Sequence, residues 1–283
     1  MKNEKSNYEL NAFAQTDYKY NKYFSGIAGL RATHNSNYGL NFVPKLTLMA
    51  KVTTSTFRLS YGWGFRSPSL KELYFDFDHL EMFTIHGNSN LRPEKSQYIG
   101  FSYDFDKPRF SSSVNLYYNR LNDLIVYRWL DSKNIYYTND SVATVAGLDL
   151  MERVMPIKNL ILSLGLSLVD AINRTSGKQL YNISPVSANV GISYFILFGK
   201  NRTSFDFYGK YNGRRVYEPL DNFQQIDMPY NIWKFSITQS YQSNLHFTLG
   251  IDNVFSQVNS RSYDNISPGR RIFVALSYNF TKY

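Results

Sequence analysis

Two of the four histidines in this chain lie close together in a segment rich in aromatic and acidic residues. His79 is preceded by Asp76 and Asp78, and His86 follows shortly after it. A neutral imidazole nitrogen binds transition metals, and a neighbouring carboxylate can fix the orientation of the ring. Side chains of these types can bind a metal or a flat apolar group, and the alternative is that both imidazoles are simply solvated. The aromatic side chains available to such a ligand are Tyr74, Phe75, Phe77 and Phe83.

The elements that must position this segment have the pattern of strands. From Leu160 to Leu168 every second residue is leucine, and most of the residues between them are Ser or Gly. A period of two is that of a strand with two different faces, whereas an amphipathic helix repeats near 3.6 residues. One apolar face and one small polar face are typical of a transmembrane β-barrel, with lipid outside and a wet lumen inside. The same alternation recurs at 57–65, 99–105, 190–198, 245–251 and 272–280.

Composition favours a membrane barrel over a soluble β-sandwich, which also alternates. Aromatic residues make up 17% of the chain, although its mean hydropathy is below zero. The alternating segments run for about 10–13 residues, which suits a tilted bilayer crossing better than the usual strand of about 5–6 residues. The sequence has no run of about 18 apolar residues, so it predicts no transmembrane helix.

Charge and cysteine content exclude several function classes. The net charge is +9, but the basic residues are scattered and no nucleic-acid-binding motif carries them, so we expect no nucleic-acid partner. The absence of cysteine excludes disulfides and thiolate metal sites. Basic residues of the expected loops could bind lipopolysaccharide phosphates or an anionic ligand. They are Arg174, Lys178, Arg214, Arg215, Arg261 and Arg270.

Connections of two lengths alternate along the chain, with tight turns typical of the periplasmic side and long loops typical of the external side. About 13 strands result, and because this count is odd, a last strand ending in the periplasm places residue 1 outside the cell. Bacterial single-chain barrels have an even count, so we expect the C-terminal portion of a larger barrel. The N-terminus also has no apolar signal segment, so we do not expect a complete exported precursor. The expected turns lie near 21–22, 53–55, 106–108, 156–158, 199–201 and 242–243, and the expected loops at 34–39, 66–93, 120–140, 171–185, 213–228 and 254–269.

Three stretches resemble the C-terminal barrel of TonB-dependent outer-membrane receptors. The first joins 44–48 to 64–74, the second is 87–96, and the third joins 250–255 to 268–271 and the last strand. The resemblance implies a barrel of about 22 strands closed by an N-terminal plug. It further implies energy-coupled import of a scarce nutrient, driven by the TonB protein acting on the N-terminus. Residues 1–283 would then form an all-β, antiparallel, partial barrel that lacks the plug, with a long external loop at 66–93 and a closing strand at 270–280.

The resemblance also implies roles for the histidine segment. Haem receptors of this family carry an axial histidine between the first two motifs, where this chain has His79 and His86. Imidazole is a strong ligand of haem iron, and we expect His79 to serve before His86. Tyr74, Phe77 and Phe83 would stack against the porphyrin. Haem is then the transported ligand and no cofactor is expected; siderophores, cobalamin and other nutrients are the alternatives.

Arg66 continues the inward face of its strand at the external end. Its guanidinium can bind acidic groups bidentately from a plug, a loop or a ligand. The alternative is that Arg66 and Glu94 merely anchor the long loop to the barrel rim.

Other classes of function fit less well. His246 and Asp252 could act as base and orienter in an enzyme, but six residues along a strand separate them by about 20 Å. The chain also has no common catalytic motif, so we expect no enzyme. A passive porin-type barrel remains an alternative, which the paired motifs around 66–94 disfavour. An open sheet of about 13 strands has two unpaired edges in lipid, so we expect residues 1–283 alone neither to form a stable pore nor to transport.

Overall fold

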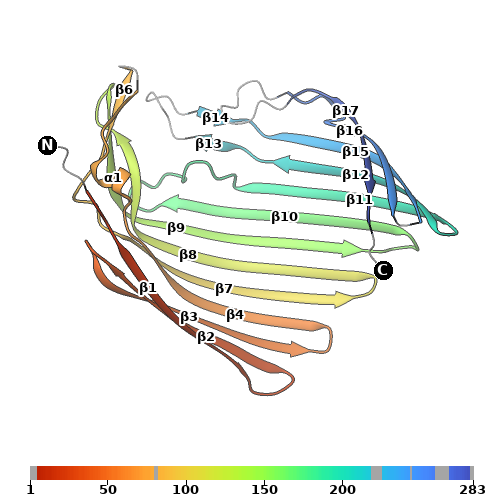
Figure 1. The fold of residues 1–283 in the computed structure, drawn as a ribbon, viewed down its shortest axis with the longest axis horizontal. Helices are drawn as coiled ribbons and strands as arrows, with labels where there is room; N and C mark the ends of the chain where they lie inside the picture. The colour runs from red at the N-terminus through yellow and green to blue at the C-terminus, as the bar shows by residue number, and fades with distance from the viewer. Residues whose placement is uncertain (1–4, 80–81, 218–224, 243, 259–267, 281–283) are drawn as a thin grey trace.

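The computed structural model describes residues 5–79, 82–217, 225–242, 244–258 and 268–280, and nearly all of its regular structure is one antiparallel sheet (Figure 1). Its main path runs β1-β2-β3-β4-β7-β8-β9-β10-β11-β12-β15-β16-β17, which confirms the expected 13 strands. In the first half these are β1 (Glu9–Lys19), β2 (Phe24–Asn35), β3 (Gly39–Val52), β4 (Ser55–Arg66), β7 (Glu94–Lys107), β8 (Phe110–Trp129) and β9 (Asn134–Val154). In the second half they are β10 (Leu160–Asn173), β11 (Val186–Phe198), β12 (Asn201–Asn212), β15 (Tyr230–Tyr241), β16 (Leu245–Asp252) and β17 (Arg271–Tyr278).

The remaining elements lie at one end of this sheet, where the longer connections gather (Figure 1). The connection between β4 and β7 contains α1 (Leu70–Tyr74) and the hairpin of β5 (Phe77–His79) and β6 (Phe83–His86). Strand β6 also pairs in parallel with the start of β9. A separate two-stranded sheet is formed by β13 (Arg215–Tyr217) and β14 (Gln225–Asp227).

The two faces of the strands differ as the alternation predicts. In β4 the large side chains of Phe57, Leu59, Tyr61 and Trp63 are exposed, and the residues between them belong to the other face. That other face is polar and hydrogen-bonded across strands. Thr47 bonds Ser60 at 3.1 Å, Ser113 donates to Asp104 at 2.7 Å, Ser167 donates to Asp149 at 2.7 Å and Ser193 donates to Asp206 at 2.5 Å.

The sheet is open among the described residues. Strand β1 pairs only with β2, and β17 pairs only with β16. Strand β1 begins at the end of the sheet where α1 lies, and β17 ends at the opposite end (Figure 1). The longest helix, α1, has five residues, and no helix in the described ranges is long and apolar enough to cross a membrane.

Most expected turns are confirmed, and two expected loops are wrong. Strands β3 and β4 are joined by two residues, as are β11 and β12, where Gly199 takes a φ of 58° that favours glycine. The loop expected at 34–39 is a tight turn, because β2 continues to Asn35 and β3 begins at Gly39 with a φ of 67°. The loop expected at 120–140 is mostly strand. Strands β8 and β9 stay paired from Phe110 and Val154 to Trp129 and Ile135.

The long β8–β9 hairpin has a simple cause in its residue types. Its outer part is rich in β-branched and aromatic residues, which favour extended backbone. These residues do not form an additional pair of strands within 120–140, because they prolong the existing pair. The hairpin therefore stands beside the β4–β7 connection and the irregular segment 174–185, and these three pieces build the candidate site.

Candidate functional site

The connection between β4 and β7, residues 67–93, starts with a capped helical turn. The Ser69 hydroxyl accepts a hydrogen bond from the Glu72 backbone N–H at 3.2 Å, and the Glu72 carboxylate accepts one from the Ser69 N–H at 2.7 Å. This capping box stabilises the start of α1, which is too short to be stable by itself. Leu73 and Pro68 are buried beneath it.

Arg66 ties both ends of this connection to the rim of the sheet. Its Nε and Nη2 donate to the two oxygens of Glu94 at 2.7 Å each, and its Nη1 lies 3.1 Å from both oxygens of Glu72. Burial raises the pKa of Glu72, but the bonds from Ser69 and the Arg66 guanidinium outweigh it and hold that pKa below its ordinary value. The guanidinium is thus engaged bidentately by Glu94, the first residue of β7, and also contacts Glu72 within the connection.

The returning half of the connection is fixed to the β8–β9 hairpin. Glu94 Oε1, which accepts from Arg66 Nη2, also accepts a hydrogen bond from the Ile125 backbone N–H at 2.8 Å. Arg92 Nη2 lies 2.7 Å from Asp123, and the Arg92 backbone N–H donates to Asn139 at 2.8 Å. Each of these contacts joins the second motif to residues 30 or more positions away, so the motif holds two external connections together.

The structure separates the two candidate histidines. His86 Nδ1 lies 3.0 Å from Asp76 Oδ1, and its Nε2 lies 3.0 Å from Asn134 Oδ1. Its ring also stacks on Tyr136 at 4.5 Å between centroids. Both nitrogens of His86 are therefore occupied, and Asp76, which we expected beside His79, orients His86 instead.

His79 lies in a row of aromatic rings. Its ring stacks on Phe83 at 5.0 Å and lies 5.9 Å from Phe77, while Phe83 contacts the edge of Trp129 at 5.6 Å. Within the described ranges its ring nitrogens make no hydrogen bond, and no three His, Asp or Glu side chains there are close enough to hold a metal ion. His79 therefore presents an imidazole with no hydrogen-bond partner in the described ranges from a surface of aromatic rings.

Tyr74 and Arg66 lie farther back on the same connection. Tyr74 ends α1 with an exposed ring, over which the Lys5 ammonium sits at 4.9 Å. The structure thus brings Phe77, His79 and Phe83 together, while Tyr74 and Arg66 belong to the base of the connection. The side-chain roles proposed for them in ligand binding stay predictions.

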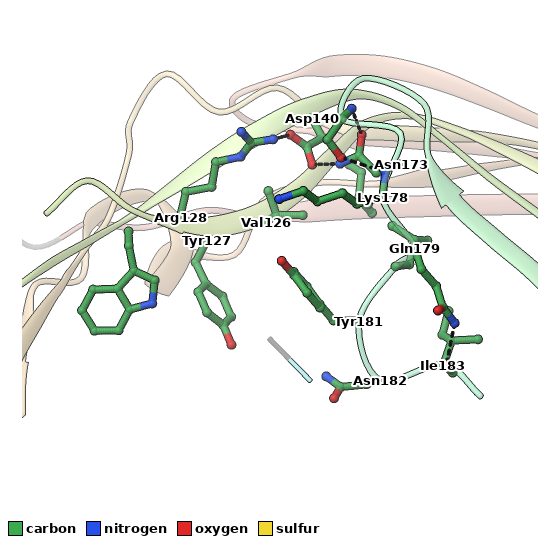
Figure 2. A pocket seen from close by; sticks show the side chains of 14 residues that line it. Val126, Tyr127, Arg128, Asp140, Asn173, Lys178, Gln179, Tyr181, Asn182 and Ile183 are labelled. Carbon is green, nitrogen blue, oxygen red and sulfur yellow. Dashed lines mark hydrogen bonds and ion pairs between the residues drawn. The ribbon is translucent and has the colours of Figure 1, made fainter. Parts of the chain in front are cut away.

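A cavity of about 470 Å³ between the β8–β9 hairpin and residues 176–183 is a feature that sequence reasoning missed (Figure 2). At its base the buried Asp140 carboxylate is paired with Arg128 and accepts a hydrogen bond from the Asn173 side-chain amide. Asn173 in turn accepts from the backbone N–H groups of Thr175 and Ser176 at 2.9 and 3.1 Å, which shapes the turn. Its walls include Leu124, Val126, Tyr127, Trp129, Lys178 and Tyr181.

Three other basic residues named from the sequence have structural partners. Arg174 Nε donates to Thr144 at 2.8 Å, Arg215 pairs with the buried Asp227 at 3.1 Å, and Arg270 donates to the Val254 carbonyl at 2.9 Å. Arg261 lies outside the described residues. Lys178 differs from these, because it lines the cavity and its ammonium makes no ion pair within the described ranges.

The pair considered for an enzyme is held apart by the register of the sheet. His246 lies opposite Ser277 and bonds Ser240 at 2.8 Å, while Asp252 lies opposite Arg271 at the other end of β16. Asp252 pairs there with Lys234 and Arg271 at 3.4 Å each. The two side chains therefore cannot act together as base and orienter.

Sequence comparison places the chain in a known family. Residues 2–254 match the model of the TonB-dependent receptor-like β-barrel. The chain belongs to this family. Members are outer-membrane receptors and not enzymes, which confirms the expected outer-membrane location and disfavours an enzymatic role in general terms.

Similar receptors agree in fold. The siderophore receptor PirA from Acinetobacter baumannii superposes with a TM-score of 0.78 at 16% identity, over 97% of this chain and 46% of PirA. The ferric enterobactin receptor PfeA from Pseudomonas aeruginosa gives 0.79 at 18% identity, over 96% of this chain and 45% of PfeA. The chain thus spans slightly under half the length of these receptors. A stretch of 104 residues is 34% identical to a probable hemoglobin and hemoglobin-haptoglobin-binding protein of Haemophilus influenzae, covering 36% of this chain and 9% of that protein.

Proposed function

We propose that this receptor barrel serves TonB-driven uptake of an iron complex across the outer membrane, and that the complex is haem. The observation that carries the proposal is the environment of His79. Its imidazole makes no hydrogen bond within the described ranges and lies between the rings of Phe77 and Phe83. A neutral imidazole flanked by flat apolar side chains suits an axial ligand of haem iron.

Sequence similarity supports the same ligand class. The relative from Haemophilus influenzae is named for binding haemoglobin, a haem protein, and its similarity to this chain reaches 34%. The solved receptors are below 25% identity, so they support the fold and not a particular ligand. A receptor of this kind would require a plug-like domain and the TonB protein as partners, together with lipopolysaccharide around the barrel.

Haem titration tests the proposal on the protein as purified from outer membranes in detergent. The wild-type protein should bind haem with a shifted Soret band, and His79→Ala should abolish that shift. His34→Ala is the matched control, because His34 is an exposed histidine of β2, outside the 67–93 connection. An unchanged Soret shift in His79→Ala would reject His79 as the iron ligand.

Two further outcomes separate the alternatives. A wild-type protein that binds no haem would make a siderophore, cobalamin or another nutrient the ligand. Growth on haem as the sole iron source should also require TonB. Growth that persists without TonB would instead indicate a passive porin-type barrel.

A further inference from the structure

The cavity beside the β8–β9 hairpin shares one residue, Trp129, with the aromatic row that contains His79. Trp129 belongs to both, because its ring contacts Phe83 at 5.6 Å and its side chain lines the cavity. His79 in turn stacks on Phe83 at 5.0 Å. Two ring contacts therefore connect the imidazole to Trp129, a residue of the cavity wall.

Among the described residues that line the cavity, the Lys178 ammonium is a cation without an ion-pair partner in the described ranges. Asp140 is buried, and its two oxygens are taken by Arg128 and by the Asn173 amide (Figure 2). Arg128 and Asp140 thus cancel each other, whereas the Lys178 side chain, which lies near them and reaches toward Val126 (Figure 2), remains as a positive charge in the cavity lining. A site with a net positive charge and low local polarity favours an anionic group on the ligand.

The rest of the lining is suited to a flat apolar body. Leu124, Val126 and Leu180 supply aliphatic surface, and Tyr127 and Tyr181 supply aromatic surface. The amide of Gln179, a natural contact for a neutral sugar, already donates to the Ile183 carbonyl at 3.0 Å. A volume of about 470 Å³ lies within the usual range for a small-molecule site.

We propose that this cavity binds the carboxylate-bearing edge of a planar apolar ligand, with the Lys178 ammonium as the ion partner of the carboxylate. The inference rests on the proposed function, since a porphyrin with its two propionates is the ligand of that shape and charge. It adds a second contact region to His79 and assigns it a different chemistry, charge recognition in place of iron ligation.

Metal-free protoporphyrin IX is the probe, because it has the carboxylates of haem and no iron for His79. Its affinity for the protein purified from outer membranes is measured by fluorescence. Lys178→Gln should weaken binding about 5-fold, and Lys178→Glu at least about 10-fold. Lys133→Glu is the matched control, since Lys133 is an exposed lysine of the neighbouring hairpin that does not line the cavity.

Two comparisons test the charge itself. Wild-type affinity should fall with added salt, and that dependence should be lost in Lys178→Gln. The dimethyl ester of protoporphyrin, which has no carboxylate, should bind the wild type and Lys178→Gln equally. Equal affinity of wild type and Lys178→Glu for protoporphyrin IX would overturn the proposal.

Failure of this inference is distinguishable from failure of the proposed function. His79→Ala should abolish the haem Soret shift while leaving protoporphyrin IX affinity within about 2-fold, because no iron bond is involved. A normal Soret shift together with unaltered protoporphyrin binding in Lys178→Glu would retain haem uptake and reject the cavity. Loss of haem binding in the wild type would reject both.

Discussion

Gly87 is the position at which the 67–93 connection is most sensitive to one added carbon. A Cβ at this residue would lie 2.7 Å from the Tyr74 nitrogen and 2.8 Å from the Leu73 carbonyl carbon and the Phe75 nitrogen. All three atoms belong to backbone and cannot rotate away. The close approach allows the Gly87 N–H to donate to the Phe75 carbonyl at 2.9 Å and the next N–H, of Asn88, to donate to Glu72 at 2.8 Å.

Gly87→Ala should therefore weaken the contact between α1 and the end of β6, which Gly87 follows. Overpacking costs about 1–3 kcal/mol, and weakening of the two backbone hydrogen bonds adds about 1 kcal/mol. We expect a local destabilisation of about 2–4 kcal/mol, or about 30–800-fold in the local opening equilibrium. Hydrogen exchange of peptides covering residues 70–88, measured by mass spectrometry on the detergent-purified protein, should speed up by that factor.

The strands should be unaffected, because the contact is confined to the connection. Gly62→Ala is the control, since a Cβ there would meet nothing closer than the Pro44 carbonyl oxygen at 3.7 Å. Exchange in residues 70–88 that is the same for Gly87→Ala as for Gly62→Ala would refute the close-approach argument. Haem binding through His79 should weaken together with the loss of protection, since β5 and β6 lie between α1 and Gly87.

Two other perturbations follow from the same structure. The pKa of Glu72 lies below its ordinary value of 4.5, so the stability that the ionised carboxylate contributes is fully present above pH 4.5 and is lost as the pH falls through the lower pKa of the folded state. Protection of residues 70–88 from hydrogen exchange should decline in that acidic range. Protection that does not change with pH would argue against the Arg66–Glu72 contact. Residues 1–283 refolded alone in detergent should be protease-sensitive and show no heat-dependent shift in electrophoretic mobility, because β1 and β17 each have an unpaired edge. A heat-modifiable, protease-resistant species would contradict that expectation.

The strand order was largely predictable from the sequence because side-chain alternation reports burial directly. In Leu160–Leu168 the leucines fix which face is apolar, and a shift of register by one residue would invert every side chain. Alternation is a local pattern, and it predicts that a segment is a strand, how long the strand is and which of its faces is apolar. It therefore yielded the 13-strand path, in which most neighbours in sequence are also neighbours in the sheet.

The lengths of the connections were less predictable, because alternation does not stop at the membrane surface. Residues 124–129 are as rich in aliphatic and aromatic side chains as the rest of the strands. The residues just before them include Asn119, Arg120 and Asn122, and this polar composition resembles that of a loop. The structure keeps these residues paired with β9, since hydrogen bonding to a neighbouring strand outweighs their low intrinsic preference for extended structure.

Part of the candidate site follows from the local sequence, and part depends on contacts between residues far apart in the chain. Spacing alone placed His79 among aromatic residues, because Phe77 and Phe83 are its neighbours in a hairpin. The assignment of Asp76 to His86 and the base of the cavity depend on contacts that spacing does not encode. Asp140 and Asn173 are 33 positions apart, and their hydrogen bond forms because β9 and β10 are adjacent in the sheet. The extension of the β8–β9 hairpin places Trp129 against Phe83, so the length of this hairpin, which composition alone did not reveal, determines whether His79 and the cavity can hold one ligand together.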